Sequence, residues 1–193
     1  MRAPLAQFHL AQVNVMRMRA PLDDATMADF VALLAPVNAL AERSPGFVWR
    51  LKTDEGDATA IRVVDDDRIL VNFSVWESQL QLWNFAYASR HLDVMRRRRE
   101  WAERLPTRTH VIWWVPAGSL PTLDDALAKL ERLRAFGPTP EAFTFRDSFP
   151  HPVALHVESN GHSPARYRDG EARREPAAGL GSVPSLPTRP IAR

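Results

Sequence analysis

Apolar and polar residues alternate along several short stretches of the chain, and this pattern predicts strands. Residues 8–18 (FHLAQVNVMRM), 69–76 (ILVNFSVW) and 109–115 (THVIWWV) each alternate with a period close to two, as a strand with two different faces does. Residues 47–52 (FVWRLK) predict a shorter strand, and residues 60–64 predict a weaker one.

Longer stretches instead space their apolar residues three or four apart, which is the spacing of a helix. These stretches are residues 24–43, 78–105 and 122–136. Thr122, with Asp125 three residues later, has the form of a capping box that begins the last helix. Pro36 is expected to kink the first helix, and Gly137-Pro138 should end the last one.

The predicted order is β-α-β-β-α-β followed by a terminal helix, and residues 143–145 predict a short closing strand after that helix. This is the order of the ferredoxin-like fold, in which an antiparallel sheet carries its helices on one face. We therefore expect an α+β domain of that type.

The two faces of the predicted sheet differ in chemistry. One face is apolar throughout, with Val13, Phe73 and Trp113 among its members, whereas the other mixes amides, hydroxyls and tryptophans. An exposed face of mixed character indicates a partner surface, and no helix is left in the prediction to cover it. We therefore expect a homodimer. Its interface would comprise these residues of the mixed face: Asn72, Ser74, Trp76 and Trp114.

Residues 150–193 differ in composition from the rest of the chain. They contain seven prolines and four glycines and have almost no periodic apolar pattern. Such a segment buries too little apolar surface to offset the entropy lost on ordering. The predicted organisation is a folded domain over residues 1–149 and a disordered Pro/Arg-rich tail over residues 150–193.

Charge placement argues against nucleic acid as a partner. The sequence pI is about 9.5, but the net charge of +2 falls entirely within residues 150–193. Residues 1–149 hold 19 basic and 19 acidic side chains and are neutral. A nucleic-acid-binding domain concentrates positive charge on its folded surface.

Other features of the sequence narrow the class of protein. The chain has no cysteine, so disulfides and thiolate chemistry play no part. No signal peptide and no run approaching a membrane span of roughly 18 apolar residues is recognised, so a cytoplasmic protein without a membrane partner is expected. The sequence also lacks a Gly-rich phosphate loop, an HExxH motif and a nucleophile elbow.

Several strings resemble a bacterial and plant family of uncharacterised domains in the dimeric α/β-barrel superfamily, alongside antibiotic-biosynthesis monooxygenases and chlorite-dismutase-like proteins. The strings are PGFVWRL (45–51), VNFSVWES (71–78), FAYASRHLDVMRRRREW (85–101) and the segment 113–145. The resemblance implies that residues 1–149 form a dimeric α/β-barrel domain whose sheet pairs with a second sheet. It departs at Ser119, where relatives often carry histidine.

The helix predicted at 78–105 carries the candidate chemistry. His91 and Tyr87 share a stripe with Met95 and Arg98 that is more polar than packing requires. The alternative is a purely structural role, in which His91 packs in the core. In the superfamily, haem-degrading members use a helix histidine as iron ligand and a strand asparagine in the distal pocket, so the resemblance implies metal ligation by His91 if haem is bound.

The candidate residues form two groups. Those expected to be catalytic are His91, Tyr87 and Asn14. Those expected to bind substrate are Arg98, Trp76, Trp83 and Trp114. Arg98 has a structural alternative, which we favour: the four arginines form a solvated helix end from which Arg98 turns inward and pairs with Glu77.

Two functions remain open on the sequence alone. The first is a monooxygenase-like enzyme, cofactor-free or haem-dependent, that acts on a small apolar substrate or on haem. The second is a non-enzymatic dimeric binding or stress-response module whose mixed sheet face is only an interface. The polar stripe around His91 favours the first.

Overall fold

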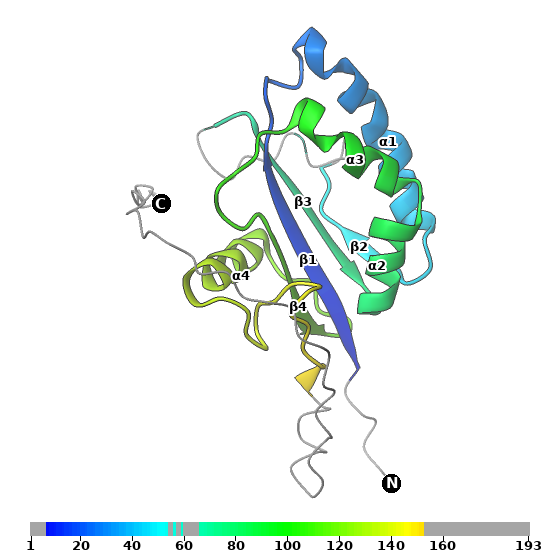
Figure 1. Cartoon of the computed structure of the whole chain (residues 1–193). Helices are drawn as coiled ribbons and strands as arrows, with labels where there is room; N and C mark the ends of the chain where they lie inside the picture. Colours follow the sequence, from blue (N-terminus) through cyan, green and yellow to red (C-terminus); the bar gives the residue numbers. More distant parts are fainter. Residues whose placement is uncertain (1–6, 54–55, 57–58, 60–65, 153–193) are drawn as a thin grey trace, which may run out of the picture. The chain divides into compact units, whose positions relative to one another are not determined.

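The computed structural model describes residues 7–53, 56, 59 and 66–152, and the elements follow the predicted order (Figure 1). The strands are β1 (Phe8–Arg17), β2 (Phe47–Arg50), β3 (Ile69–Trp76) and β4 (His110–Pro116). The helices are a short 3-10 turn η1 (Ala25–Met27), α1 (Ala28–Arg43), α2 (Gln79–Ala88), α3 (His91–Trp101) and α4 (Leu123–Phe136). The strand predicted at 60–64 lies outside the described residues.

The strands form a four-stranded antiparallel sheet in the order β2-β3-β1-β4. In this arrangement α1 connects the parallel pair β1 and β2, and α2 with α3 connects the parallel pair β3 and β4. This is the ferredoxin-like topology that the element order predicts. Residues 143–145, expected as a closing strand, contribute only an isolated bridge from Phe143 to Ile112.

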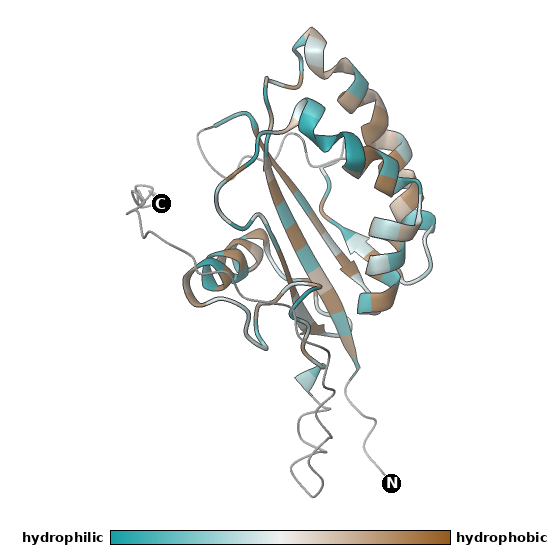
Figure 2. Cartoon of the chain, in the orientation of Figure 1, coloured by the Kyte–Doolittle hydropathy of each residue, from teal (hydrophilic) through white to brown (hydrophobic). Residues whose placement is uncertain are grey.

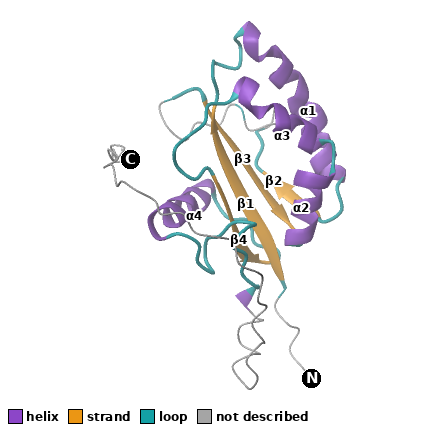
Figure 3. Ribbon diagram, in the orientation of Figure 1, coloured by secondary structure: helices purple, strands orange, loops and turns teal. Residues whose placement is uncertain are grey.

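Helices cover both faces of the sheet (Figure 3). On the apolar face, Val13, Phe73 and Trp113 pack against Leu130 of α4. The mixed face is covered by α1, α2 and α3. Two clusters bury its apolar members: the first joins Leu10, Trp76 and Ile112 to Ala41 and Leu82, and the second joins Met18 and Leu70 to Phe30 and Trp101. Figure 2 shows the alternation along β1 that produces the two faces.

The predicted dimer interface is therefore wrong in its location. Trp76 has no exposed surface and Ser74 is 6% exposed, because helices of the same chain cover them. We expected all helices to lie on the apolar face, but α1, α2 and α3 cover the mixed face and, among the described helices, only α4 covers the apolar face. A homodimer stays a prediction, and it would have to use another surface.

The long helix predicted at 78–105 is two helices. Ser89 separates them: its hydroxyl donates to the carbonyl of Phe85 at 2.5 Å and accepts from the backbone N–H of His91 at 3.1 Å. A serine that bonds the backbone on both sides competes with continuous helix. The break places His91 at the first position of α3.

The ends of the other helices follow the expected chemistry. Thr122 and Asp125 form the predicted capping box, each side chain bonding the other residue's backbone N–H. Pro36 lies inside α1.

By length and composition alone, the 19 residues Ala25–Arg43, with a mean hydropathy of 1.2, could cross a membrane. In this fold the same residues form the crossover on the sheet.

Contacts of the described chain continue slightly beyond the predicted domain boundary at 149. The ring of His151 stacks on Phe8 with centroids 5.7 Å apart. The ring of Trp114 also lies edge-on to His151 at 6.0 Å, and its indole donates to the carbonyl of Phe149, the last residue of the predicted domain, at 2.8 Å. Most of the predicted tail, residues 153–193, lies outside the described residues, so its disorder stays a prediction.

Candidate functional site

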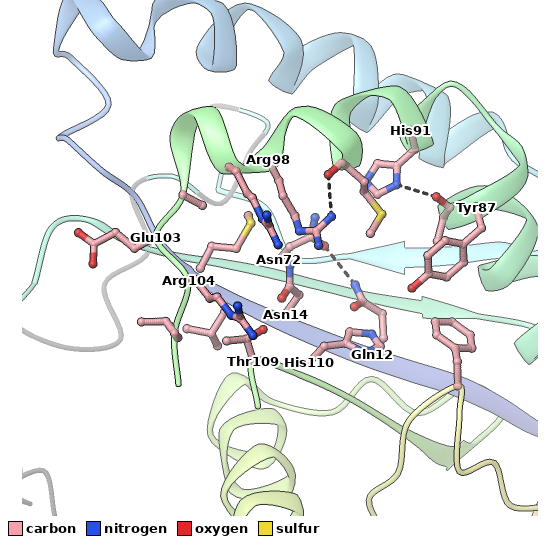
Figure 4. Close-up of a pocket in the computed structure, with 18 of the residues that line it drawn as sticks. Gln12, Asn14, Asn72, Tyr87, His91, Arg98, Glu103, Arg104, Thr109 and His110 are labelled. Atoms are coloured by element: carbon pink, nitrogen blue, oxygen red, sulfur yellow. Dashed lines mark hydrogen bonds between the residues drawn. The ribbon is translucent and has the colours of Figure 1, made fainter. Parts of the chain in front are cut away.

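A cleft of about 510 Å³ lies between the mixed face of the sheet and the helices α2 and α3 (Figure 4). This volume is within the range of about 300–1,000 Å³ that small-molecule sites occupy. Side chains from β1, β3 and β4 form its floor, α2 and α3 form its wall, and the segment after α3 closes one end. The residues that line it include Gln12, Asn14, Asn72, Phe85, Tyr87, His91, Met95, Arg98, Arg99, Glu103, Arg104, His110 and Phe145.

Strand register places a row of polar side chains across the floor. Asn14 of β1 pairs with Asn72 of β3 on one side and with His110 of β4 on the other. Residues paired across adjacent strands point to the same face, so all three side chains share the cleft. The side-chain amide of Asn14 makes no hydrogen bond within the described part of the chain, which leaves it free to contact a ligand.

Beside this row, a buried hydrogen-bond network stiffens the floor. The amide nitrogen of Gln12 donates to Asn72 Oδ1 at 3.1 Å and to Ser74 Oγ at 2.9 Å. The same hydroxyl oxygen accepts from the indole of Trp76 at 2.9 Å. Gln12, Ser74 and the Trp76 indole thereby satisfy one another in a buried setting, and Asn72 extends the network to the exposed surface of the cleft. The floor is consequently preorganised by the protein itself.

His91 lines the wall of the cleft and is half-buried. Its ring stacks on Phe85 with centroids 4.7 Å apart, and Nδ1 lies 3.3 Å from the carbonyl oxygen of Ala86. Burial lowers the pKa of His91, and the bond to Ala86 opposes this more weakly. A neutral ring that donates from Nδ1 keeps a lone pair on Nε2, which can act as a base or as a metal ligand.

An aromatic cluster forms the end of the cleft near α2. Phe145 lies edge-on to Tyr87, with centroids 5.8 Å apart, and stacks on the ring of His110 at 5.7 Å. Burial lowers the pKa of His110 to about 4, so this ring is neutral at neutral pH. The Tyr87 hydroxyl makes no hydrogen bond to the rest of the described chain. This end therefore offers ring faces together with one free hydroxyl.

Of the seven side chains predicted to form a site, the structure brings four together. Asn14, Tyr87, His91 and Arg98 all line the cleft. Their functional roles stay predictions. The expected ion pair between Arg98 and Glu77 is absent: Arg98 donates to the carbonyl of Met95 at 2.9 Å, while Glu77 accepts from Gln81.

The three tryptophans predicted to bind substrate lie outside the cleft lining. Trp76 is fully buried beneath Phe85, at a centroid distance of 5.0 Å. Trp83 is 45% exposed and packs on the outer side of Tyr87 at 4.3 Å. Trp114 is held by its bond to Phe149. Trp76 and Trp83 therefore support rings that do line the cleft.

Sequence reasoning missed several cleft residues. His110 was visible in the strand THVIWWV on the mixed face, but only the register shows that it lies beside Asn14. Arg99 and Arg104 carried no signal beyond the run of arginines. Within the described residues, no group of three or more His, Asp or Glu side chains could hold a metal ion.

Comparisons with known proteins add a family and one solved structure. Residues 9–159 match the family described as "Domain of unknown function (DUF3291)". No curated protein is significantly similar to the chain. The chain is similar to SnoaB, described as a cofactor-independent oxygenase from Streptomyces nogalater, with 20% identity and a TM-score of 0.41. That match covers 60% of this chain and 96% of SnoaB.

Proposed function

Because the chain belongs to the DUF3291 family, whose description assigns no function, we propose a function from the cleft itself. The protein binds a small, largely apolar molecule between the sheet and the helices α2 and α3. The observation that carries this proposal is the set of unpaired polar groups on Asn14, Tyr87 and His91, which line one cleft against aromatic walls. A few convergent polar groups in an apolar cleft are typical of ligand sites.

The enzymatic form of the proposal is a monooxygenase-like reaction in this cleft. Neutral His91 would take a proton from an acidic C–H or O–H group of the bound substrate through Nε2, while Nδ1 stays on the Ala86 carbonyl. Asn14 and the Tyr87 hydroxyl would stabilise the resulting anion. A methylene oxidised in this way consumes one O₂ and yields a carbonyl group and one water.

The first experiment asks only whether the cleft binds. N-phenylnaphthylamine, a neutral apolar dye that fluoresces when it leaves water, is titrated into the whole chain. Asn72→Trp fills the cleft, and the exposed position of Asn72 lets the larger ring enter without displacing core side chains. Asn84→Trp makes the same change on the exposed side of α2, outside the cleft.

We expect wild type and Asn84→Trp to bind the dye equally and Asn72→Trp to lose at least about tenfold in affinity, or about 1.4 kcal/mol. Absence of binding in wild type, or equal binding by both variants, would contradict the proposed site. A non-enzymatic binding protein would give the same result in this dye titration. It would differ only in that it converts no substrate to product.

A further inference from the structure

The arginines of α3 and the segment after it fall into two sets, and the two sets have different partners. Arg96 and Arg97 do not line the cleft and are paired, Arg96 with Asp93 at 3.3 Å and Arg97 with Glu100 at 2.9 Å. Three other arginines line the cleft: Arg98, Arg99 and Arg104. None of these three is within ion-pair distance of a carboxylate of the described residues.

One carboxylate does line the cleft, but it is already neutralised. Glu103 lies 3.0 Å from Arg17 and 3.3 Å from Arg68. Arg17 and Arg68 also share the carboxylate of Asp66, at 2.9 Å and 3.5 Å. This network of two arginines and two carboxylates balances its own charge. The cleft therefore keeps the charge of its three unpaired guanidinium groups.

The cationic groups lie at one end of the cleft and the rings at the other. In Figure 4, Arg98 and Arg104 lie toward the end of α3, whereas Tyr87 and His91 lie toward α2. Both histidines of the cleft, His91 and His110, have lowered pKa values and add no positive charge at neutral pH. Charge and apolar surface are thus separated along the length of one cleft.

We propose that the ligand is an apolar organic acid, held with its carboxylate or sulfonate group between Arg98, Arg99 and Arg104 and its ring system against Phe85, Tyr87 and Phe145. A guanidinium group offers five donors in a planar fork that matches a carboxylate. Arg98 spends one donor on the carbonyl of Met95, which fixes its side chain and leaves the others free. This inference rests on the proposed function and names its substrate class.

The test uses two dyes that share one ring system. Anilinonaphthalene sulfonate carries an anionic group that N-phenylnaphthylamine lacks. The variants are Arg98→Gln, Arg99→Gln and Arg104→Gln, alone and combined, and the control is Arg96→Gln on the outer side of α3. Circular dichroism and binding of the neutral dye report on the fold of each variant.

We expect the combined variant to lose at least about tenfold in affinity for the sulfonate dye while its affinity for the neutral dye changes less than about twofold. Added salt should lower the affinity for the sulfonate dye but not for the neutral dye, because salt screens interactions between exposed charges. Arg96→Gln should bind both dyes like wild type. No loss for either dye, or equal losses for both with an unchanged circular dichroism spectrum, would overturn the inference.

Competition identifies what the arginines recognise. Naphthoate and inorganic phosphate are each used to displace the sulfonate dye from wild type. We expect naphthoate to compete at a far lower concentration, because it also fills the apolar end. If phosphate competes equally well, the cleft recognises charge alone and an apolar acid is the wrong class. If neither dye binds wild type at all, the proposed function fails with the inference.

Discussion

The imidazole of His91 is hydrogen-bonded to the carbonyl oxygen of Ala86, five residues earlier and on the other side of the break between α2 and α3. The bond joins the last turn of one helix to the first residue of the next. It selects the tautomer with the proton on Nδ1, so Nε2 remains the basic nitrogen. The break at Ser89 thus positions the group to which the sequence assigned the chemistry.

The hypothesis that His91 ligates haem iron predicts a spectroscopic result. Hemin added to the purified chain should give a shifted Soret band, and His91→Ala should abolish the shift while preserving the circular dichroism spectrum. His151→Ala, which changes a histidine outside the cleft, is the control. A wild-type spectrum without a His91-dependent shift would reject haem and leave a cofactor-free cleft.

His110 should make folding stability depend on pH. Its pKa is about 4 when folded, against 6.5 as the ordinary value, so the unfolded chain binds this proton more readily. The contribution of His110 to the free energy of unfolding is therefore fully present above pH 6.5. It is lost as the pH drops toward 4, by no more than about 3 kcal/mol. His110→Phe keeps the stacking on Phe145 and removes the titration.

Urea unfolding of wild type and His110→Phe at several pH values between 4 and 7 measures this effect. We expect the variant to lose less stability than wild type on acidification. The lowered pKa of His91 acts in the same direction in both proteins, so it does not contribute to their difference. Parallel pH profiles for the two proteins would show that His110 is accessible to water.

Ser74 should matter more to stability than its size suggests. Its hydroxyl oxygen accepts from both Gln12 and Trp76 in a buried setting. Ser74→Ala leaves the Trp76 indole N–H without an acceptor, at a cost of about 1–3 kcal/mol. Ser119→Ala, in an exposed turn, is the matched control and should change the free energy of unfolding by less than about 0.5 kcal/mol. Equal effects of the two substitutions would refute the network.

The composition of the tail predicts that it is dispensable to the domain. A chain ending at Pro152 keeps the His151 contact with Phe8 and should melt within about 2 °C of the full chain, since a change of 1 kcal/mol shifts the midpoint by roughly 2–4 °C at this size. Thermal unfolding followed by circular dichroism measures this. A much lower midpoint would show that residues after 152 pack on the domain.

The sequence predicted correctly which residues share a face of the sheet, but not which helices cover each face. Alternation along β1 separates Val13 from Asn14 because successive side chains of a strand point to opposite faces. That pattern says nothing about which helix packs on which face, so Trp76 was expected at an interface and lies beneath Phe85. A mixed face is compatible with a ligand cleft as well as with a partner surface.

Within the site, helical spacing found the residues of one wall and register was needed for the rest. Tyr87 and His91 lie one turn apart, so the stripe survives even though the helix breaks between them. Trp83, one helical turn before Tyr87, packs on the Tyr87 ring but is 45% exposed and does not line the cleft. The place of His110 depends on the pairing of β1 with β4, which is a long-range contact without a local signal.

The location of a bound ligand tests the central claim most directly. Backbone amide shifts of the isotopically labelled chain, recorded by NMR while anilinonaphthalene sulfonate is added, report where the dye lies. We predict that the largest changes fall on residues around the cleft, including Asn14, Tyr87, His91 and Arg98. Changes confined to α4, which lies on the opposite face of the sheet, would contradict the assignment of the cleft as the functional site.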